Sequence, residues 1–161
     1  MDEIFNPINY EENNCDFIFQ YKNTKVFLSD YTTSHKNDYL MENNIKYIIN
    51  ATIKYPNFFK NTIKYLRIPI RNRSVYVSEL YKKIPNIFNF FDKCVENESN
   101  ILIHCKRGHR RSATIVCILL LKYKHINVED SIGLVKNIRP NSFKQSTKIN
   151  EILKYLPDFK D

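Results

Sequence analysis

The sequence is poor in glycine, lacks tryptophan and contains no long apolar run. Only two glycines occur in 161 residues, so each one is a candidate for a position that needs unusual backbone freedom. The longest apolar stretch, residues 114–121, is far shorter than the roughly 20 residues that cross a bilayer. We therefore expect no membrane span, and the acidic, polar N-terminus is atypical of a secretory or mitochondrial leader.

The sequence contains few cysteines, and their spacing matches no known disulfide, redox or metal-binding motif. No CxxC motif or metal-ligand pattern includes any of the four, which are Cys15, Cys94, Cys105 and Cys117. Disulfides are rare in reducing compartments, so the sequence favours a soluble, cytoplasmic protein with free thiols. The abundance of Asn, Lys, Ile and Tyr indicates an A/T-rich genome, such as that of a large DNA virus. In that case the host cytoplasm or the virion is expected.

Length and charge limit the organisation of the chain and its partners. The 161 residues, 43% of them hydrophobic, predict a single domain over residues 1–161, with a polar N-terminal extension over 1–15. The formal net charge of +8 favours polyanionic partners such as phosphate esters, RNA or an anionic membrane surface.

Short apolar segments alternate with segments of helical periodicity. Five segments rich in β-branched and aromatic residues predict strands over 17–21, 25–28, 46–50, 65–68 and 101–104. The spacing of apolar residues predicts helices over 34–42, 78–96, 111–123, 128–137 and 142–156. The turn at 22–24 predicts a hairpin of the first two strands. This alternation indicates an α/β domain with a largely buried sheet, in which ligands bind at the carboxyl ends of the strands.

Three residues fix helix boundaries in this prediction. Asn127 and Ser142 are suitable N-caps for the last two helices. Pro85 predicts either a break within the 78–96 segment or a helix start near it, because proline lacks the amide donor that a helix interior needs.

The loop after the last predicted strand contains the strongest motif. It reads HCKRGHRRS over residues 104–112. Cys-x5-Arg alone is weak evidence, since four cysteines and seven arginines produce it by chance in roughly one such chain in six. The context is more specific, because one of the two glycines lies at the centre of the loop and the loop joins an apolar strand to an apolar helix.

Each residue type in this loop suits nucleophilic attack on phosphate. Backbone amides at a helix N-terminus bind a phosphate dianion, and Gly108 permits a positive φ and a close approach. The same amides lower the pKa of Cys105, so that a thiolate nucleophile exists at neutral pH. Arg111 offers a planar fork for two phosphate oxygens, and the Ser112 hydroxyl can donate a hydrogen bond to the sulfur.

The remaining loop residues have simpler expected roles. His104 is expected to hydrogen-bond the backbone beside the cysteine, and a metal role is not expected without a second ligand nearby. The substrate-binding residues predicted here are Lys106, Arg107, Gly108, His109, Arg110 and Arg111. The other three cysteines are expected to be small buried hydrophobic residues.

His104-Cys105-x5-Arg111-Ser112 resembles the signature of the cysteine-based protein phosphatases, and its surroundings resemble their small dual-specificity branch. Supporting segments are 25–29, 44–50, 65–70, 139–141 and 143–145. The resemblance implies four or five mostly parallel strands flanked by helices, with no metal and no cofactor. It also implies phosphorylated protein substrates, with phosphotyrosine and phosphoserine or phosphothreonine hydrolysed through a phosphocysteine.

The sequence departs from this family where the general acid is expected. The family carries an aspartate there, whereas residues 70–78 contain no carboxylate and Asn72 occupies the matching position. An amide cannot donate a proton as an acid does, and losing general acid catalysis costs about 10²–10⁴ in rate. Three alternatives are open: Glu79 or Asp92 reaches the site, His109 donates the proton, or the site works without an acid.

The number of cations leaves the substrate open. Arg71 and Arg73 add to the charge of the loop, which suits doubly phosphorylated peptides, RNA 5′-triphosphate ends or phosphoinositides. Tyr76 and Tyr81 are candidate stacking residues for RNA, although tyrosine is more often a packing residue. We rank a dual-specificity protein phosphatase first and an RNA or phosphoinositide phosphatase second. A slow or inactive phosphate-binding module ranks third, because such a module needs no reactive thiol.

Overall fold

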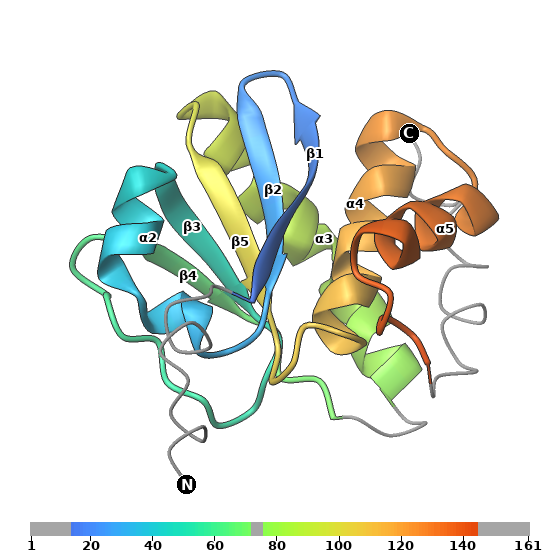
Figure 1. Cartoon of the computed structure of the whole chain (residues 1–161), viewed down its shortest axis with the longest axis horizontal. Coiled ribbons are helices and arrows are strands. Elements are labelled where there is room, and N and C mark those ends of the chain that lie inside the picture. Colours follow the sequence, from blue (N-terminus) through green and yellow to red (C-terminus); the bar gives the residue numbers. More distant parts are fainter. Residues whose placement is uncertain (1–13, 72–75, 145–161) are drawn as a thin grey trace, which may run out of the picture.

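A five-stranded sheet forms the centre of the computed structural model, which describes residues 14–71 and 76–144 (Figure 1). The strands lie in the order β1-β2-β5-β3-β4. Their bounds are β1 Cys15–Tyr21, β2 Thr24–Ser29, β3 Ile45–Asn50, β4 Lys64–Arg67 and β5 Asn100–His104. All neighbouring pairs are parallel except β1 and β2, which form an antiparallel hairpin. The predicted α/β class, mostly parallel sheet and hairpin are confirmed.

Helices cover both faces of the sheet. They are α2 Asn37–Glu42, α3 Tyr76–Glu96, α4 Arg111–Lys124 and α5 Val128–Ile138, with a short 3-10 turn, η2, at Thr33–His35. Side chains of α3, α4 and α5 share the larger hydrophobic core, whereas Leu40 of α2 belongs to the smaller core on the opposite face. Within the described ranges, no helix is long and apolar enough to cross a membrane.

Strand β5 shows why the sequence forms this layered structure. Successive side chains of a strand point to opposite faces. Ile101 and Ile103 are therefore buried in the larger core, and Leu102 lies between them in the smaller one. All three are fully buried, as expected for a central parallel strand that is covered on both sides.

Several predicted boundaries need correction. The single helix predicted over 34–42 is divided into η2 and α2. The break predicted at Pro85 is wrong, because α3 continues through this residue. The fully buried side chains of Ile84 and Ile87 on either side offset the one amide hydrogen bond that a proline removes.

One predicted N-cap is confirmed, whereas the predictions for the two chain ends fall partly outside the described residues. The Asn127 side chain accepts a hydrogen bond from the Asp130 amide at 2.7 Å, which confirms this N-cap. Ser142 lies in a turn that includes residues 141–144, and the rest of the helix predicted over 142–156 lies outside the described residues. Strand β1 begins at Cys15, inside the range predicted as an extension, of which residues 1–13 also lie outside them.

Candidate active site

The loop between β5 and α4 is held from outside through its carbonyl groups. The Lys106 carbonyl accepts a hydrogen bond from the Tyr31 amide at 3.1 Å, and the His109 carbonyl accepts one from the Phe143 amide at 2.8 Å. Because β5 lies between two parallel neighbours, this loop occupies the carboxyl edge of the sheet, where such folds bind ligands.

The Cys105 thiol lies at the base of this loop and is stabilised as a thiolate. Its Sγ lies 3.1 Å from the Ser112 hydroxyl oxygen and accepts a hydrogen bond from the Gly108 amide, with a nitrogen–sulfur distance of 3.3 Å. Burial raises the pKa of the Cys105 thiol. The Ser112 hydroxyl and amide, then the Arg111 charge and the Gly108 amide, outweigh burial, so this pKa lies below its ordinary value. The geometry provides a nucleophile at neutral pH.

Gly108 occupies a position that excludes every side chain. Its φ is +77°, in the left-handed region that favours glycine. A Cβ here would lie 2.5 Å from the Ser29 carbonyl oxygen and 2.8 Å from a guanidinium nitrogen of Arg139. The backbone of the loop therefore lies directly against the end of β2, with no space for a side chain at residue 108.

Arg111 is the first residue of α4 and faces the other wall of the site. Its guanidinium Nη1 donates a hydrogen bond to the Ile70 carbonyl at 3.2 Å. The same charge lowers the pKa of Cys105, so the guanidinium lies within electrostatic reach of the thiolate. Arg111 thus has the placement expected of a residue that grips phosphate oxygens.

His104 contacts the backbone, as the sequence predicts. The ring is 1% exposed, and its Nδ1 lies 3.1 Å from the Cys105 carbonyl oxygen, an acceptor to which this nitrogen donates. Burial lowers the pKa of His104 to about 4, so the ring is neutral at physiological pH. No group of three His, Cys, Asp or Glu residues suited to a metal occurs in the part of the chain that the structure describes.

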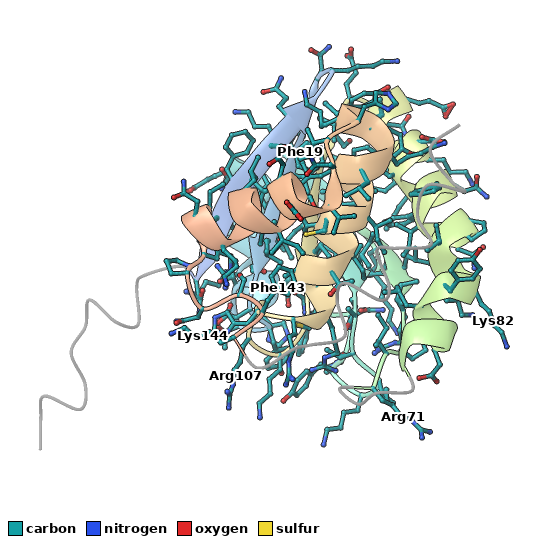
Figure 2. All side chains as sticks on the ribbon, turned by 90° about the vertical axis from the view of Figure 1, so that its right-hand side faces the viewer. Phe19, Arg71, Lys82, Arg107, Phe143 and Lys144 are labelled. Carbon is teal, nitrogen blue, oxygen red and sulfur yellow. The ribbon has the colours of Figure 1, made fainter. Side chains whose placement is uncertain are left out.

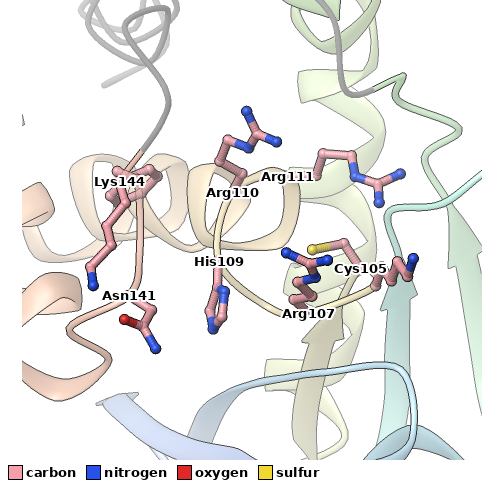
Figure 3. Close-up of a pocket in the computed structure, with 9 residues that line it drawn as sticks. Cys105, Arg107, His109, Arg110, Arg111, Asn141 and Lys144 are labelled. Atoms are coloured by element: carbon pink, nitrogen blue, oxygen red, sulfur yellow. The ribbon is translucent and has the colours of Figure 1, made fainter.

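A pocket of about 520 Å³ opens above the thiol (Figure 3). Its lining residues are Cys105, Lys106, Arg107, His109, Arg110, Arg111, Asn141, Phe143 and Lys144. Figure 2 shows Phe143, Lys144 and Arg107 at the same end of the molecule. The loop residues were predicted from the sequence, whereas the contribution of the segment after α5 was not. No carboxylate is among these lining residues, and none of their cations has an ion pair within residues 14–71 and 76–144.

One candidate for the general acid, His109, lies in the loop itself. Asn72 falls outside the described residues. His109 lines the pocket, but burial lowers its pKa, and the charges of Arg139 and Arg107 lower it further. The His109 ring is therefore mainly neutral at neutral pH, which disfavours it as a proton donor.

The other two alternatives lie on α3. The Asp92 carboxylate accepts a hydrogen bond from the Tyr123 hydroxyl at 2.7 Å. Tyr123 is near the C-terminal end of α4, roughly 18 Å along the helix from Arg111, so the hypothesis that Asp92 supplies the acid is wrong. Glu79 is exposed and lines a separate pocket of about 260 Å³ that also includes Ile70. Glu79 is thus near the Arg111 contact but not in the main pocket.

Of the two tyrosines proposed for stacking, Tyr81 is the one whose side chain the structure describes. Tyr81 packs against the larger hydrophobic core, which is the ordinary packing role. Tyr76 is the first residue of α3, and its side chain lies outside what the structure describes.

Arg139 contacts the loop and was not predicted as a site residue. Its guanidinium donates hydrogen bonds to the Gly108 carbonyl at 3.1 Å and to the Arg107 carbonyl at 3.0 Å. One signal was available, because Arg139 opens the 139–141 segment that resembles the phosphatase family. That signal did not indicate a contact with a loop about thirty residues away.

The pKa values of the other three thiols are shifted in the opposite direction to that of Cys105. Burial raises the pKa of each to about 12, for Cys15, Cys94 and Cys117 alike. All four cysteines are free. Cys105 is therefore the thiol with the greatest thiolate character, although it is as well covered as two of the others.

Comparison with known proteins gives consistent matches. Residues 26–156 match the model of the dual specificity phosphatase catalytic domain. The chain is 32% identical over 118 residues to the dual specificity protein phosphatase Mpk3 of Drosophila melanogaster, which covers 72% of this chain and 28% of that protein. It is 34% identical over 110 residues to dual specificity protein phosphatase 6 of Homo sapiens, covering 65% of this chain and 28% of that protein. The chain thus spans under a third of these two relatives.

A solved structure shares the fold. The leucine rich repeat and phosphatase domain containing protein from Entamoeba histolytica superposes with a TM-score of 0.74 at 22% identity. The superposition covers 90% of this chain and 91% of that chain.

Proposed function

Because this chain belongs to the dual specificity phosphatase family, we propose that it hydrolyses phosphate monoesters through a phosphocysteine at Cys105. One observation carries the proposal. The Cys105 Sγ is held between the Ser112 hydroxyl and the Gly108 amide, with a lowered pKa, at the base of a cation-lined pocket. This arrangement suits a thiolate that attacks bound phosphate.

In the first step the thiolate attacks phosphorus, the sulfur–phosphorus bond forms and the ester phosphorus–oxygen bond breaks. The leaving oxygen departs with the bonding electron pair. Arg111 and the loop amides stabilise the charge on the equatorial phosphate oxygens. The described lining residues include no carboxylate to protonate the leaving oxygen, so its proton comes from water after it departs.

In the second step water attacks the phosphocysteine, the sulfur–phosphorus bond breaks and inorganic phosphate leaves. The sulfur regains its electron pair as a thiolate. The Ser112 hydroxyl, 3.1 Å from Sγ, donates a hydrogen bond that stabilises this leaving thiolate. Neither step requires a metal or another cofactor.

We propose phosphorylated proteins as the substrates. Without an acid at the position of Asn72, the leaving group must carry its own negative charge. A phenolate does so far better than an alkoxide, so phosphotyrosine should react faster than phosphoserine or phosphothreonine. Both classes remain substrates, in the sense of dual specificity.

A second candidate is a substrate in which the leaving group is itself a phosphate, such as an RNA 5′-triphosphate end; a phosphoinositide is a related polyanion. The observation that favours such polyanions is the set of five cations without a carboxylate partner in the described residues: Lys106, Arg107, Arg110, Arg111 and Lys144. That charge exceeds the needs of one phosphate dianion. A purely phosphate-binding role is disfavoured by the lowered pKa of Cys105.

The experiment compares hydrolysis of an aryl phosphate, a tyrosine phosphopeptide and triphosphate-ended RNA by the wild-type chain and by Cys105→Ser. The proposal expects phosphate release from the aryl ester and the phosphopeptide, with none from Cys105→Ser. RNA as the preferred substrate would replace the first candidate by the second. Vanadate binding without release of phosphate from any substrate would contradict both and leave the binding role.

A further inference from the structure

Arg139 is a buried arginine that joins the nucleophile loop to the N-terminal strand. Its side chain is 4% exposed and donates to the carbonyls of Arg107 and Gly108 on one side. On the other side it donates to Asp16 and Asn14, each at 2.8 Å. We propose that Arg139 is a positioning residue, which aims the loop amides at the thiolate and the bound phosphate. The inference rests on the proposed function and deepens it.

The planarity of the peptide bond between Arg107 and Gly108 connects Arg139 to the nucleophile. In a trans peptide the carbonyl and the following N–H point in opposite directions. The Arg107 carbonyl points outward to Arg139, so the Gly108 N–H must point inward. That N–H indeed faces the Cys105 sulfur, with a nitrogen–sulfur distance of 3.3 Å. A contact that lowers the pKa of Cys105 is therefore oriented by Arg139.

The next peptide unit follows the same rule. The Gly108 carbonyl accepts from Arg139 Nε, so the His109 N–H points toward the inside of the loop. The His109 carbonyl accepts from the Phe143 amide, which turns the Arg110 N–H inward as well. One segment after α5 thus orients three successive amides of an anion-binding concavity.

The guanidinium has the shape that this task requires. Two of its nitrogens bind successive loop carbonyls while Nη1 pairs with the Asp16 carboxylate at 2.8 Å. The Asp16 charge balances the buried cation, which would otherwise be costly to bury. Lysine has a single nitrogen on a flexible stem and cannot hold the same fork geometry.

Close packing leaves little room for the loop to relax without this residue. A Cβ at Gly108 would contact both Ser29 and Arg139, so the loop is wedged between β2 and the guanidinium. Removing the guanidinium frees two carbonyls and allows their peptide planes to rotate. The Gly108 N–H then loses its fixed aim at Sγ.

The test measures the thiol and the anion site directly, in Arg139→Ala and Arg139→Lys. Readouts are the pH dependence of Cys105 alkylation, which reports the thiol pKa, and the affinity for vanadate. We expect the thiol pKa of Cys105 to rise in both variants. Vanadate affinity and kcat/KM should fall about 10²-fold in Arg139→Ala, comparable to the loss of one oxyanion donor, and less in Arg139→Lys.

Arg67 supplies a matched control. It is another arginine that holds loop carbonyls, those of Thr52, Ile53 and Tyr55, and within the described residues it has no hydrogen bond to residues 105–110. Arg67→Ala should lower the free energy of unfolding while the Cys105 thiol pKa and vanadate affinity stay at their wild-type values.

Two outcomes decide the matter. If Arg139 variants lose stability as Arg67→Ala does but keep the thiol pKa and vanadate affinity, Arg139 is merely structural and the inference is overturned. If Arg139→Ala does not fold, Arg139→Lys is judged by the same two readouts. These readouts need no turnover, so an inactive wild-type chain would refute the proposed function while the Arg139 test still gives an answer.

Discussion

The two sides of the pocket differ in how completely they are built. On the phosphate side, Cys105 has two hydrogen-bond partners, and every carbonyl from Lys106 to His109 is bound from outside. On the other side, Arg111 donates a hydrogen bond to the Ile70 carbonyl, and the sequence of residues 70–78 contains no carboxylate. The difference teaches that the hydrogen bonds that hold a thiolate can all be present in a pocket whose described lining includes no carboxylic acid.

The largest expected effect comes from breaking the phosphate side. Cys105→Ser should lower kcat at least about 10⁴-fold, because a neutral serine hydroxyl here has no base to activate it. Vanadate affinity should remain measurable, since the amides are intact. Arg111→Ala should lose both activity and vanadate affinity. Kinetics and equilibrium binding check both; Cys105→Ser activity within tenfold of wild type would refute the nucleophile assignment.

A second expected difference separates Cys105 from the other thiols. A thiol with a pKa of about 12, such as Cys117, holds almost no thiolate at pH 7, so peroxide should oxidise Cys105 at least about 10³-fold faster. Inactivation should be reversible by a reducing thiol. Mass spectrometry of partly oxidised protein checks the order, and earlier oxidation of Cys15 or Cys117 would contradict it.

A third prediction concerns the addition of an acid that could protonate the leaving group. Asn72→Asp restores a carboxylic acid where the family carries one, and we expect up to about a 10²-fold gain in kcat/KM for phosphoserine. The gain for an aryl phosphate with an acidic phenol should be small. Asn72→Gln is the matched control, because it changes the side chain without adding an acid. Equal gains on both substrates would argue against proton donation.

The last prediction concerns stability rather than rate, and it tests His104, which lies beneath the phosphate side. Burial lowers the pKa of His104 to about 4 from an ordinary 6.5, so folding favours the neutral ring. That stabilisation is fully present above about pH 6.5 and is lost as the pH falls toward 4, for a total of about 3 kcal/mol. Denaturant unfolding of wild type and His104→Asn across this range checks it. Identical pH slopes would mean that His104 is not the group responsible.

The strands and the nucleophile loop were predictable because their signals are local. β-branched runs mark the strands, and the loop motif lies within nine consecutive residues. The continuation of α3 through Pro85 was not predictable, since buried contacts of Ile84 and Ile87 decide it. The same holds for Arg139, whose partners Asn14 and Asp16 are more than 120 residues away in the sequence.

Asp92 shows the same limit at the level of the site. Its placement on α3 leaves open which way the carboxylate faces. The hydrogen bond to the Tyr123 hydroxyl depends on how α3 packs against α4, which no local pattern encodes. Residue type alone therefore suggested an acid that tertiary packing places elsewhere.

The dependence of kcat/KM on leaving-group pKa tests the asymmetry of the pocket most directly. A series of aryl phosphates with phenols of increasing pKa, extended to phosphoserine, should give log kcat/KM values that fall steeply for the wild-type chain. This slope is expected because the described residues that line the pocket include no acid to neutralise the charge on the departing oxygen. Asn72→Asp should give a shallower line. A flat line for the wild type would contradict the account, since another residue would then already protonate the leaving group.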